Sequence, residues 1–252
     1  MAEEKDQYGN IEKIPVKGVR KKIFKHMIEA THQSAAVTHM DEADVTELDA
    51  LIKKEKEKYK KKGIKVTMMP YLVKAIVATL KKNPYFNAHV DDTSENILLK
   101  KYYNIGVAVN TDAGLIVPVV KDADKKSIEE IAHEIFDLAA RCNDRKVKLD
   151  ELKGGTFTIS NVGAIGGIFV TPILNYPEIS ILATGRTKEK PVVVKGEIVI
   201  RKMLPLSLTF DHRVIDGAEA AKFCNELKEY LESTEVLLAE INESKADSIG
   251  PF

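Results

Sequence analysis

One histidine stands where an apolar segment gives way to a polar turn, a place from which a side chain can reach solvent and do acid–base chemistry. The apolar run ends in Phe210-Asp211-His212, and Asp216 follows four residues later. A neutral imidazole with a pKa near ~6.5 can accept a proton from a thiol of pKa about 8.5, so His212 is a candidate general base. The alternative is structural: His212 satisfies a buried hydrogen bond and Asp216 caps the next helix. A single His-x-x-x-Asp motif favours that alternative.

Ser160 is a second candidate, because it ends a β-rich run between clusters of glycine. A strand-end hydroxyl can donate to a negative oxygen that develops during a reaction, or it can satisfy nearby backbone groups. The glycines around it are Gly154, Gly155, Gly163, Gly166 and Gly167. They show neither a GxGxxG spacing nor a following Lys-Ser/Thr, so they indicate tight turns around Ser160 and not a phosphate-binding loop.

The elements that must position these residues follow from hydrophobic periodicity. Helical spacing of apolar residues predicts helices at 19–33, 44–62, 70–82, 127–143 and 218–231, the fourth beginning with a Ser127–Glu130 capping box. Short β-rich runs predict strands at 86–90, 97–100, 103–110, 115–119, 156–160, 179–184, 192–194, 198–201 and 204–210. This order predicts an α/β fold, an α+β two-layer sandwich with a mixed sheet. We expect an N-terminal arm (1–15), one catalytic domain (16–238) and a C-terminal extension (239–252).

Composition and charge exclude several classes of function. The chain has 252 residues with 38 Lys and Arg against 38 Asp and Glu, so its formal net charge is zero and we expect no nucleic-acid or membrane partner. The apolar runs are shorter than a membrane helix requires and the acidic start is no signal peptide, so we expect a cytoplasmic location. Cys142, Cys224 and the scattered histidines lack metal-ligand spacing, so we expect no metal site.

Several blocks of sequence, in the same order along the chain, together resemble one known family. They are Val19–Met27, Thr38–Glu42, Asn104–Val109, Gly114–Pro118, Gly154–Gly163, Pro177–Ile181 and Leu206–Gly217. Over roughly residues 14 to 238 they resemble the catalytic domains of the dihydrolipoyl acyltransferases, the E2 components of 2-oxo acid dehydrogenase complexes. The resemblance implies the chloramphenicol-acetyltransferase-like fold of CoA-dependent acyltransferases.

The resemblance also implies a role for each candidate residue. His212 would deprotonate the thiol of coenzyme A, or of dihydrolipoamide in the reverse direction, while Ser160 would stabilise the oxyanion. Asp216 and Arg20 would form a supporting ion pair. The residues implied to contact coenzyme A are Ser160, Asn161, Gly185, Lys13 and Asn110. Asn110 stands where some relatives carry Asp.

The same resemblance implies an assembly with other proteins. It implies homotrimers in which His212 of one chain faces Ser160 of its neighbour, and trimers that build larger cores of the 24-mer or 60-mer type. The chain shows no lipoyl or peripheral-subunit-binding domain, so we expect the lipoyl group, a substrate, to arrive on a separate domain. The dehydrogenase (E1) and dihydrolipoyl dehydrogenase (E3) components would be its other partners.

The acyl group and two alternative functions stay open at this point. We expect an acetyl or branched-chain group, because succinyl-transferring relatives tend to carry Thr at the position of Ser160. A free-standing O-acetyltransferase of the chloramphenicol acetyltransferase type would share His212 and Asp216 but should lack the Gly154–Gly163 block. A non-catalytic structural core would not need His212, Asp216, Ser160 and Arg20, yet all four are present.

Overall fold

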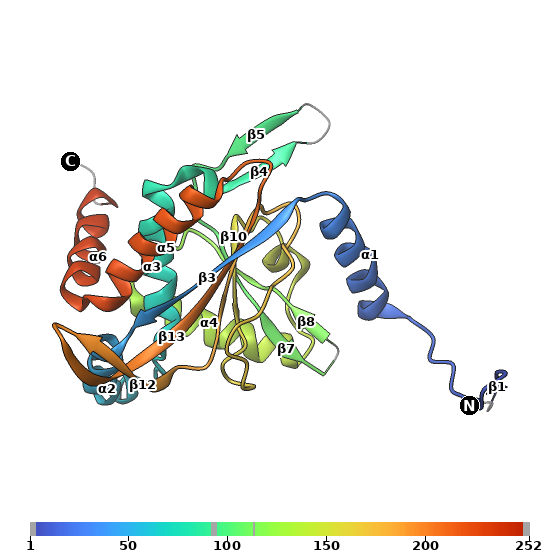
Figure 1. The fold of residues 1–252 in the computed structure, drawn as a ribbon, viewed down its shortest axis with the longest axis horizontal. Helices are drawn as coiled ribbons and strands as arrows, with labels where there is room; N and C mark the ends of the chain where they lie inside the picture. Colours follow the sequence, from blue (N-terminus) through green and yellow to red (C-terminus); the bar gives the residue numbers. More distant parts are fainter. Residues whose placement is uncertain (1–3, 92–94, 113, 249–252) are drawn as a thin grey trace.

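A mixed sheet forms the centre of the computed structural model, which describes residues 4–91, 95–112 and 114–248 (Figure 1). The strand order is β12-β13-β11-β10-β6-β9, and β3 pairs with the opposite edge of β13. Strand β10 is parallel to β11 and β6, whereas β13 is antiparallel to β11. The bounds are β3 (Ala36–Asp44), β6 (Ile105–Val107), β9 (Val119–Val120), β10 (Phe157–Asn161), β11 (Ser180–Thr184), β12 (Lys188–Val194) and β13 (Glu197–Asp211).

Helices form the second layer, and one apolar core joins them to the sheet. The Phe223 ring of α5 stacks on Phe86 with ring centroids 4.3 Å apart and on Phe157 of β10 at 6.1 Å. The bounds are α2 (Thr46–Lys61), α3 (Met68–Lys82), α4 (Ile128–Asn143), α5 (Gly217–Glu232) and α6 (Thr234–Ser248). The predicted two-layer sandwich with a mixed sheet is confirmed. Within the described residues, no helix is long and apolar enough to cross a membrane.

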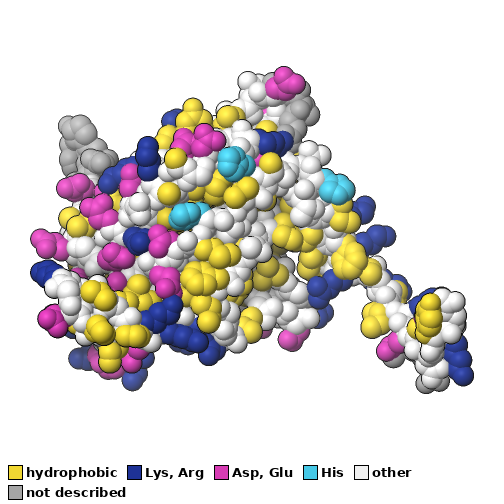
Figure 2. Space-filling model, viewed as in Figure 1, with side chains coloured by type: hydrophobic (Ala, Val, Ile, Leu, Met, Phe, Trp, Pro, Cys, Tyr) yellow, Lys and Arg dark blue, Asp and Glu magenta, His cyan; other side chains and the backbone are white. Residues whose placement is uncertain are grey.

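Helix α1 (Gly18–His32) stands apart from the helical layer, and the N-terminal arm leads away from the body (Figure 1). Only Ala30 of this helix is buried, whereas Val19, Phe24 and Ile28 are exposed. Figure 2 shows hydrophobic side chains gathered on the surface where α1 meets the rest of the molecule. A single chain therefore leaves the apolar face of α1 largely uncovered.

The shorter elements are hairpins and single turns. The paired strands are β1 (Glu4–Lys5) with β2 (Asn10–Ile11), β4 (Ala88–Asp91) with β5 (Asn96–Leu99), and β7 (Val109–Thr111) with β8 (Gly114–Ile116). The 3-10 turns are η1 (Pro84–Phe86) and η2 (Leu149–Leu152).

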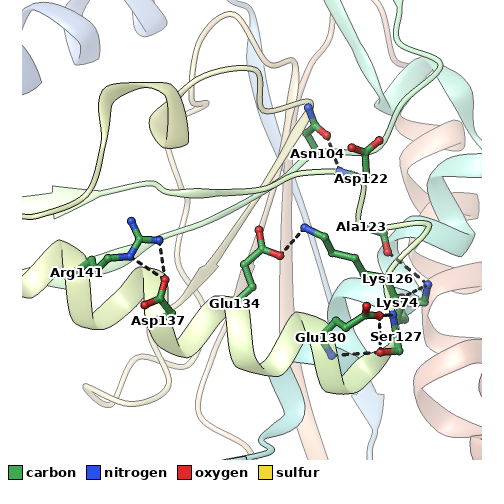
Figure 3. A network of polar contacts seen from close by, with 10 residues as sticks. All are labelled: Lys74, Asn104, Asp122, Ala123, Lys126, Ser127, Glu130, Glu134, Asp137 and Arg141. Atoms are coloured by element: carbon green, nitrogen blue, oxygen red, sulfur yellow. Dashed lines mark hydrogen bonds and ion pairs between the residues drawn. The ribbon is translucent and has the colours of Figure 1, made fainter.

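A polar network fixes the loop between β9 and α4 (Figure 3). The predicted capping box is present: the Ser127 hydroxyl accepts from the Glu130 amide at 3.2 Å, and the Glu130 carboxylate accepts from the Ser127 amide at 2.7 Å. Beneath the loop, the buried Lys74 ammonium donates to the carbonyl oxygens of Asp124 and Lys126, both at 3.0 Å. These bonds anchor the start of α4 to α3.

Several elements differ from the sequence prediction. Strands β1, β2 and β3 and helix α6 were not predicted, and β12 begins four residues before its predicted start at 192. The two segments 198–201 and 204–210 form the single strand β13, whereas the single segment 103–110 forms the two strands β6 and β7. Helix α6 also spans the expected boundary between residues 238 and 239. The remaining helices agree with the predicted ranges to within about two residues at each end, which is the usual uncertainty of helix ends.

Candidate active site

His212 lies directly after the last residue of β13, where the chain turns toward α5. Its amide donates to the Ala35 carbonyl at 2.9 Å, so the backbone of the turn is held against the chain that enters β3. The imidazole side chain is 44% exposed, and its centroid lies 5.8 Å from that of the buried Phe210 ring. His212 is therefore fixed at its base and open to solvent at its tip.

An ion pair between a buried carboxylate and a partly exposed guanidinium holds this turn in place. The Asp211 carboxylate is only 1% exposed and accepts from the Arg213 guanidinium at 2.7 Å, with further contacts at 3.1 Å from Arg213 Nε. It also accepts from the backbone amides of Arg213 and Ala35, at 3.0 and 3.3 Å. Arg213 in turn donates to the Gln33 carbonyl at 2.5 Å. The residues on either side of His212 thus clamp it to the segment between α1 and β3.

The expected pair of Asp216 with Arg20 does not form in the chain as described. Asp216 is 81% exposed and precedes α5; its Oδ1 lies 4.0 Å from His212 Nδ1, and its amide donates to Glu219. Arg20 lies on α1, and its guanidinium comes close to Gly114 of the β7–β8 hairpin. The supporting ion pair beside the histidine is Asp211–Arg213 instead. Sequence analysis missed it, although residues two apart at a strand end project from the same side and can pair.

Ser160 and His212 lie at opposite ends of the sheet within one chain. Ser160 pairs with Ala183 of β11, and Ala183 pairs with Ser207 of β13. His212 comes five residues after Ser207, and at about 3.3 Å per residue it lies roughly 17 Å further along. Two strand spacings add about 10 Å sideways. One chain therefore does not bring these two side chains to the same reacting group.

A pocket of about 250 Å³ lies at the Ser160 end of the sheet. Its lining residues are Met68, Met69, Leu72, Asn161, Gly163, Ala164, Thr184, Gly185, Arg186, Thr187 and Leu204. The structure thus brings together Asn161 and Gly185, two of the expected coenzyme A contacts. Gly185 is buried, and a Cβ there would overlap the Ile168 carbonyl oxygen, so the close approach of these two backbone segments requires glycine.

Two expected contacts lie away from this pocket. Lys13 is in the N-terminal arm, where it forms an exposed ion pair with Glu4. Asn110 is exposed on β7, opposite Leu115 of β8. In place of these residues the structure places Arg186 at the pocket, where its Nε donates to the Gly163 carbonyl at 3.2 Å. Sequence analysis missed Arg186, although a basic residue directly after the glycine of a predicted site was a usable signal.

The cysteines and metal-ligating residue types form no competing site among the described residues. Burial, with a smaller contribution from Asp41, raises the pKa of the Cys224 thiol to about 12, so this thiol is no nucleophile at neutral pH. Within the same residues, no group of three or more His, Cys, Asp and Glu side chains could hold a metal ion.

Comparison with known proteins finds relatives that are similar to this chain over most of its length. The dihydrolipoyllysine-residue acetyltransferase component of the pyruvate dehydrogenase complex of Staphylococcus epidermidis is 48% identical over 229 residues, which are 91% of this chain and 52% of the relative. The chain thus spans about half the length of the curated relatives that it matches.

Solved structures of related proteins share the fold of this chain. Dihydrolipoamide acetyltransferase of Azotobacter vinelandii is 38% identical with a TM-score of 0.89, covering 92% of this chain and 96% of that chain. A structure of the cubic core of a pyruvate dehydrogenase multienzyme complex matches with the same values. Chloramphenicol acetyltransferase, at 14% identity, 86% and 98% coverage and a TM-score of 0.53, confirms the predicted fold alone.

The family assignment rests on the length of chain that is matched. The model of the 2-oxoacid dehydrogenases acyltransferase (catalytic domain) family matches residues 8–239, and the blocks quoted from the sequence fall within that range. The chain therefore belongs to the family of 2-oxoacid dehydrogenase acyltransferase catalytic domains.

Proposed function

We propose that this chain is the catalytic core of a dihydrolipoyllysine-residue acetyltransferase, which transfers an acetyl group between S-acetyl dihydrolipoamide and coenzyme A. The observation that carries the proposal is the solvent-open His212, on a turn held by the Asp211–Arg213 ion pair in a member of this family. The choice of acetyl over branched-chain groups is supported by the names of relatives at 46 to 48% identity.

His212 acts as the general base in this proposal. The exposed Asp216 carboxylate lies 4.0 Å from Nδ1, which is too far for a hydrogen bond. In the proposed mechanism a proton lies on Nδ1, which leaves Nε2 free to accept one. His212 Nε2 takes the proton of the coenzyme A thiol, and the thiolate sulfur forms a bond to the acetyl carbonyl carbon. The bond from that carbon to the dihydrolipoamide sulfur then breaks, and His212 returns its proton to the leaving sulfur. The reaction is neutral overall and consumes no other reactant.

The partner subunit's Ser160 completes the site. Negative charge develops on the carbonyl oxygen in the tetrahedral transition state, and one hydroxyl donor placed there contributes about 2.7–4 kcal/mol of stabilisation. The separation of Ser160 from His212 within one chain supports a site shared between two subunits.

The pocket beside Ser160 is suited to part of the coenzyme A chain. Its apolar wall comes from Met68, Met69 and Leu72, and Arg186 supplies a positive charge for an anionic phosphate. We assign Asn161 and Gly185 to this contact. Lys13 stays an expectation that depends on where the arm lies in the assembled protein.

The proposed assembly is a trimer that builds a larger core. The exposed apolar face of α1 and the separated catalytic residues support the trimer, and the cubic core formed by a relative supports the larger assembly. A lipoyl domain would deliver the acyl group, and the E1 and E3 components would be the remaining partners.

A single substitution tests the proposal. His212→Ala should lower kcat at least ~100-fold because the thiol loses its general base, while the exposed His133→Ala should behave as wild type. The assay measures acyl-CoA formation from S-acyl dihydrolipoamide with acetyl, isobutyryl, isovaleryl and succinyl donors. We expect the acetyl donor to react fastest. Equal rates for the two variants would refute general-base catalysis by His212.

A further inference from the structure

A buried carboxylic acid lies close to the catalytic elements and has no part in the reaction as proposed. Glu178 is 3% exposed and precedes β11, and its backbone forms a bridge with His89 of β4. The next residue, Ile179, accepts from the amide of Asp211 at 2.9 Å, directly before His212. Glu178 is thus connected through the backbone to the catalytic turn.

The Glu178 side chain connects three separate parts of the chain. Its Oε2 lies 2.5 Å from the Thr158 hydroxyl on β10, and its Oε1 accepts from the Asn175 amide nitrogen at 3.0 Å. Asn175 continues the network, because its Oδ1 lies 3.1 Å from His26 Nε2 on α1. The carboxyl group therefore joins β10, the loop before β11 and, through Asn175, helix α1.

The space around this carboxyl group is fully packed. A Cβ at Gly155 would overlap Glu178 Oε1, so the glycine allows the backbone before β10 to pass directly over the acid. Thr158 precedes Ser160 by two residues, and alternation along β10 puts both side chains on one face of the strand. A bond that fixes Thr158 therefore also fixes the part of β10 from which Ser160 projects.

The surroundings of Glu178 supply hydrogen bonds but no cation. Two histidines are linked to it, His26 of α1 through Asn175 and His89 of β4 through the backbone bridge. Burial and the charge of Lys100 lower the pKa of His89, and its Nε2 lies 3.2 Å from the Gly155 carbonyl. No salt bridge reaches Glu178 within the described residues. Burial therefore dominates, and it raises the pKa of Glu178 to about 8 from an ordinary value of 4.5.

We infer that Glu178 is a positioning residue for acyl transfer, its carboxyl group holding the strand of Ser160 against the 175–178 loop and α1. This inference rests on the proposed function. The neutral acid can donate to Thr158 and accept from Asn175, whereas the ionised form can only accept and leaves a buried charge without a partner cation. Catalysis by this chain should therefore weaken when Glu178 loses its proton.

The sign of the pH effect follows from the raised pKa. The unfolded chain releases this proton near pH 4.5 and the folded chain near pH 8. The contribution of Glu178 to stability is therefore complete below about pH 4.5 and is lost as the pH rises to about 8. Gln has the shape and the donor–acceptor pattern of the neutral acid and does not titrate, so Glu178→Gln should remove both effects.

The test compares the wild-type chain with Glu178→Gln and with the exposed control Glu197→Gln between pH 6 and 9.5. We measure kcat and KM with coenzyme A and S-acetyl dihydrolipoamide, and the thermal midpoint at each pH. We expect Glu178→Gln to keep wild-type kcat at pH 6.5 within about twofold and to exceed the wild-type kcat as the pH rises through 8. The advantage of Glu178→Gln in thermal midpoint should grow from pH 6 to about 8 and level off above it. Glu197→Gln should follow the wild type.

Two outcomes contradict different claims. If the activity of Glu178→Gln declines at alkaline pH as the wild-type activity does, this inference alone is overturned. A wild-type chain that is inactive at every pH would overturn the proposed function.

If Glu178→Gln does not fold, Thr158→Val gives the second test, because it removes the hydroxyl partner while keeping the shape. We expect it to lower kcat about tenfold with KM for coenzyme A nearly unchanged. An unchanged kcat would overturn the inference.

Discussion

At the scale of the residue, the turn that carries His212 is held by the ion pair between Asp211 and Arg213. His212 was found because an imidazole at a strand end is open to solvent, and the structure places it there. Its clamp was assigned to Asp216 and Arg20, whereas Asp211 and Arg213 form it. Asp211 is a charged residue inside a strand that is otherwise apolar at its end, and only the folded backbone shows that it is buried with two amides and a guanidinium around it.

This clamp leads to a prediction about Asp211. Asp211→Asn keeps the shape but removes the charge opposite Arg213, so we expect a loss of about 1–3 kcal/mol in unfolding free energy together with a lower kcat. Urea denaturation and steady-state kinetics measure the two effects. The control is Asp144→Asn, which alters an exposed ion pair with Lys146 and should change stability by less than about 0.5 kcal/mol. Equal behaviour of the two variants would show that the Asp211–Arg213 pair does not support the turn.

At the scale of the element, hydrophobic periodicity predicted most of the helices. It failed for elements whose bounds depend on the neighbouring strands and helices in the fold. The prediction divided β13 at Lys202 and Met203, but both residues pair in the strand, with Glu189 and Lys188 of β12. Pro205 also lies within β13. Its carbonyl accepts from the Gly185 amide at the point where the neighbouring strand changes from β12 to β11. A break of this kind in the ladder, like a bulge, is a position at which proline is tolerated.

Two other elements lack the regular spacing of apolar residues from which strands and helices are predicted. Strand β3 is the edge strand of the sheet and alternates polar with apolar residues irregularly, so its pairing with β13 is visible only in the fold. Helix α6 has no strongly apolar face of its own, although Leu237 and Ile241 are buried against the core. In both cases the neighbouring element and not the local sequence fixes the structure.

The pocket gives the prediction that belongs to this scale. Gly185→Ala places a methyl group against the Ile168 carbonyl, so the 162–170 loop must move away from the end of β11. We expect KM for coenzyme A to rise about tenfold or more with a smaller change in kcat. Gly9→Ala is the control, because a Cβ there meets nothing within 4 Å. An unchanged KM for coenzyme A in Gly185→Ala would show that coenzyme A does not bind in this pocket.

At the scale of the whole molecule, the two residues proposed for catalysis lie far apart within one chain. The register of β10, β11 and β13 places Ser160 at one end of the sheet and His212 at the other. The apolar face of α1 is uncovered in the single chain, which is the state expected of a surface that packs in an oligomer (Figure 2). Sequence reasoning led to the proposed shared site only through family resemblance, since no local pattern encodes the distance between two strand ends.

Complementation between inactive variants tests the shared site most directly. His212→Ala and Ser160→Ala chains, each nearly inactive alone, are co-expressed in equal amounts and purified as mixed trimers. A site that takes His212 from one chain and Ser160 from the next is intact in about a quarter of random arrangements, so activity should return to about a quarter of the wild-type value. If both residues served a site within one chain, every site would carry one lesion. Mixed trimers as inactive as the two parents would contradict the account.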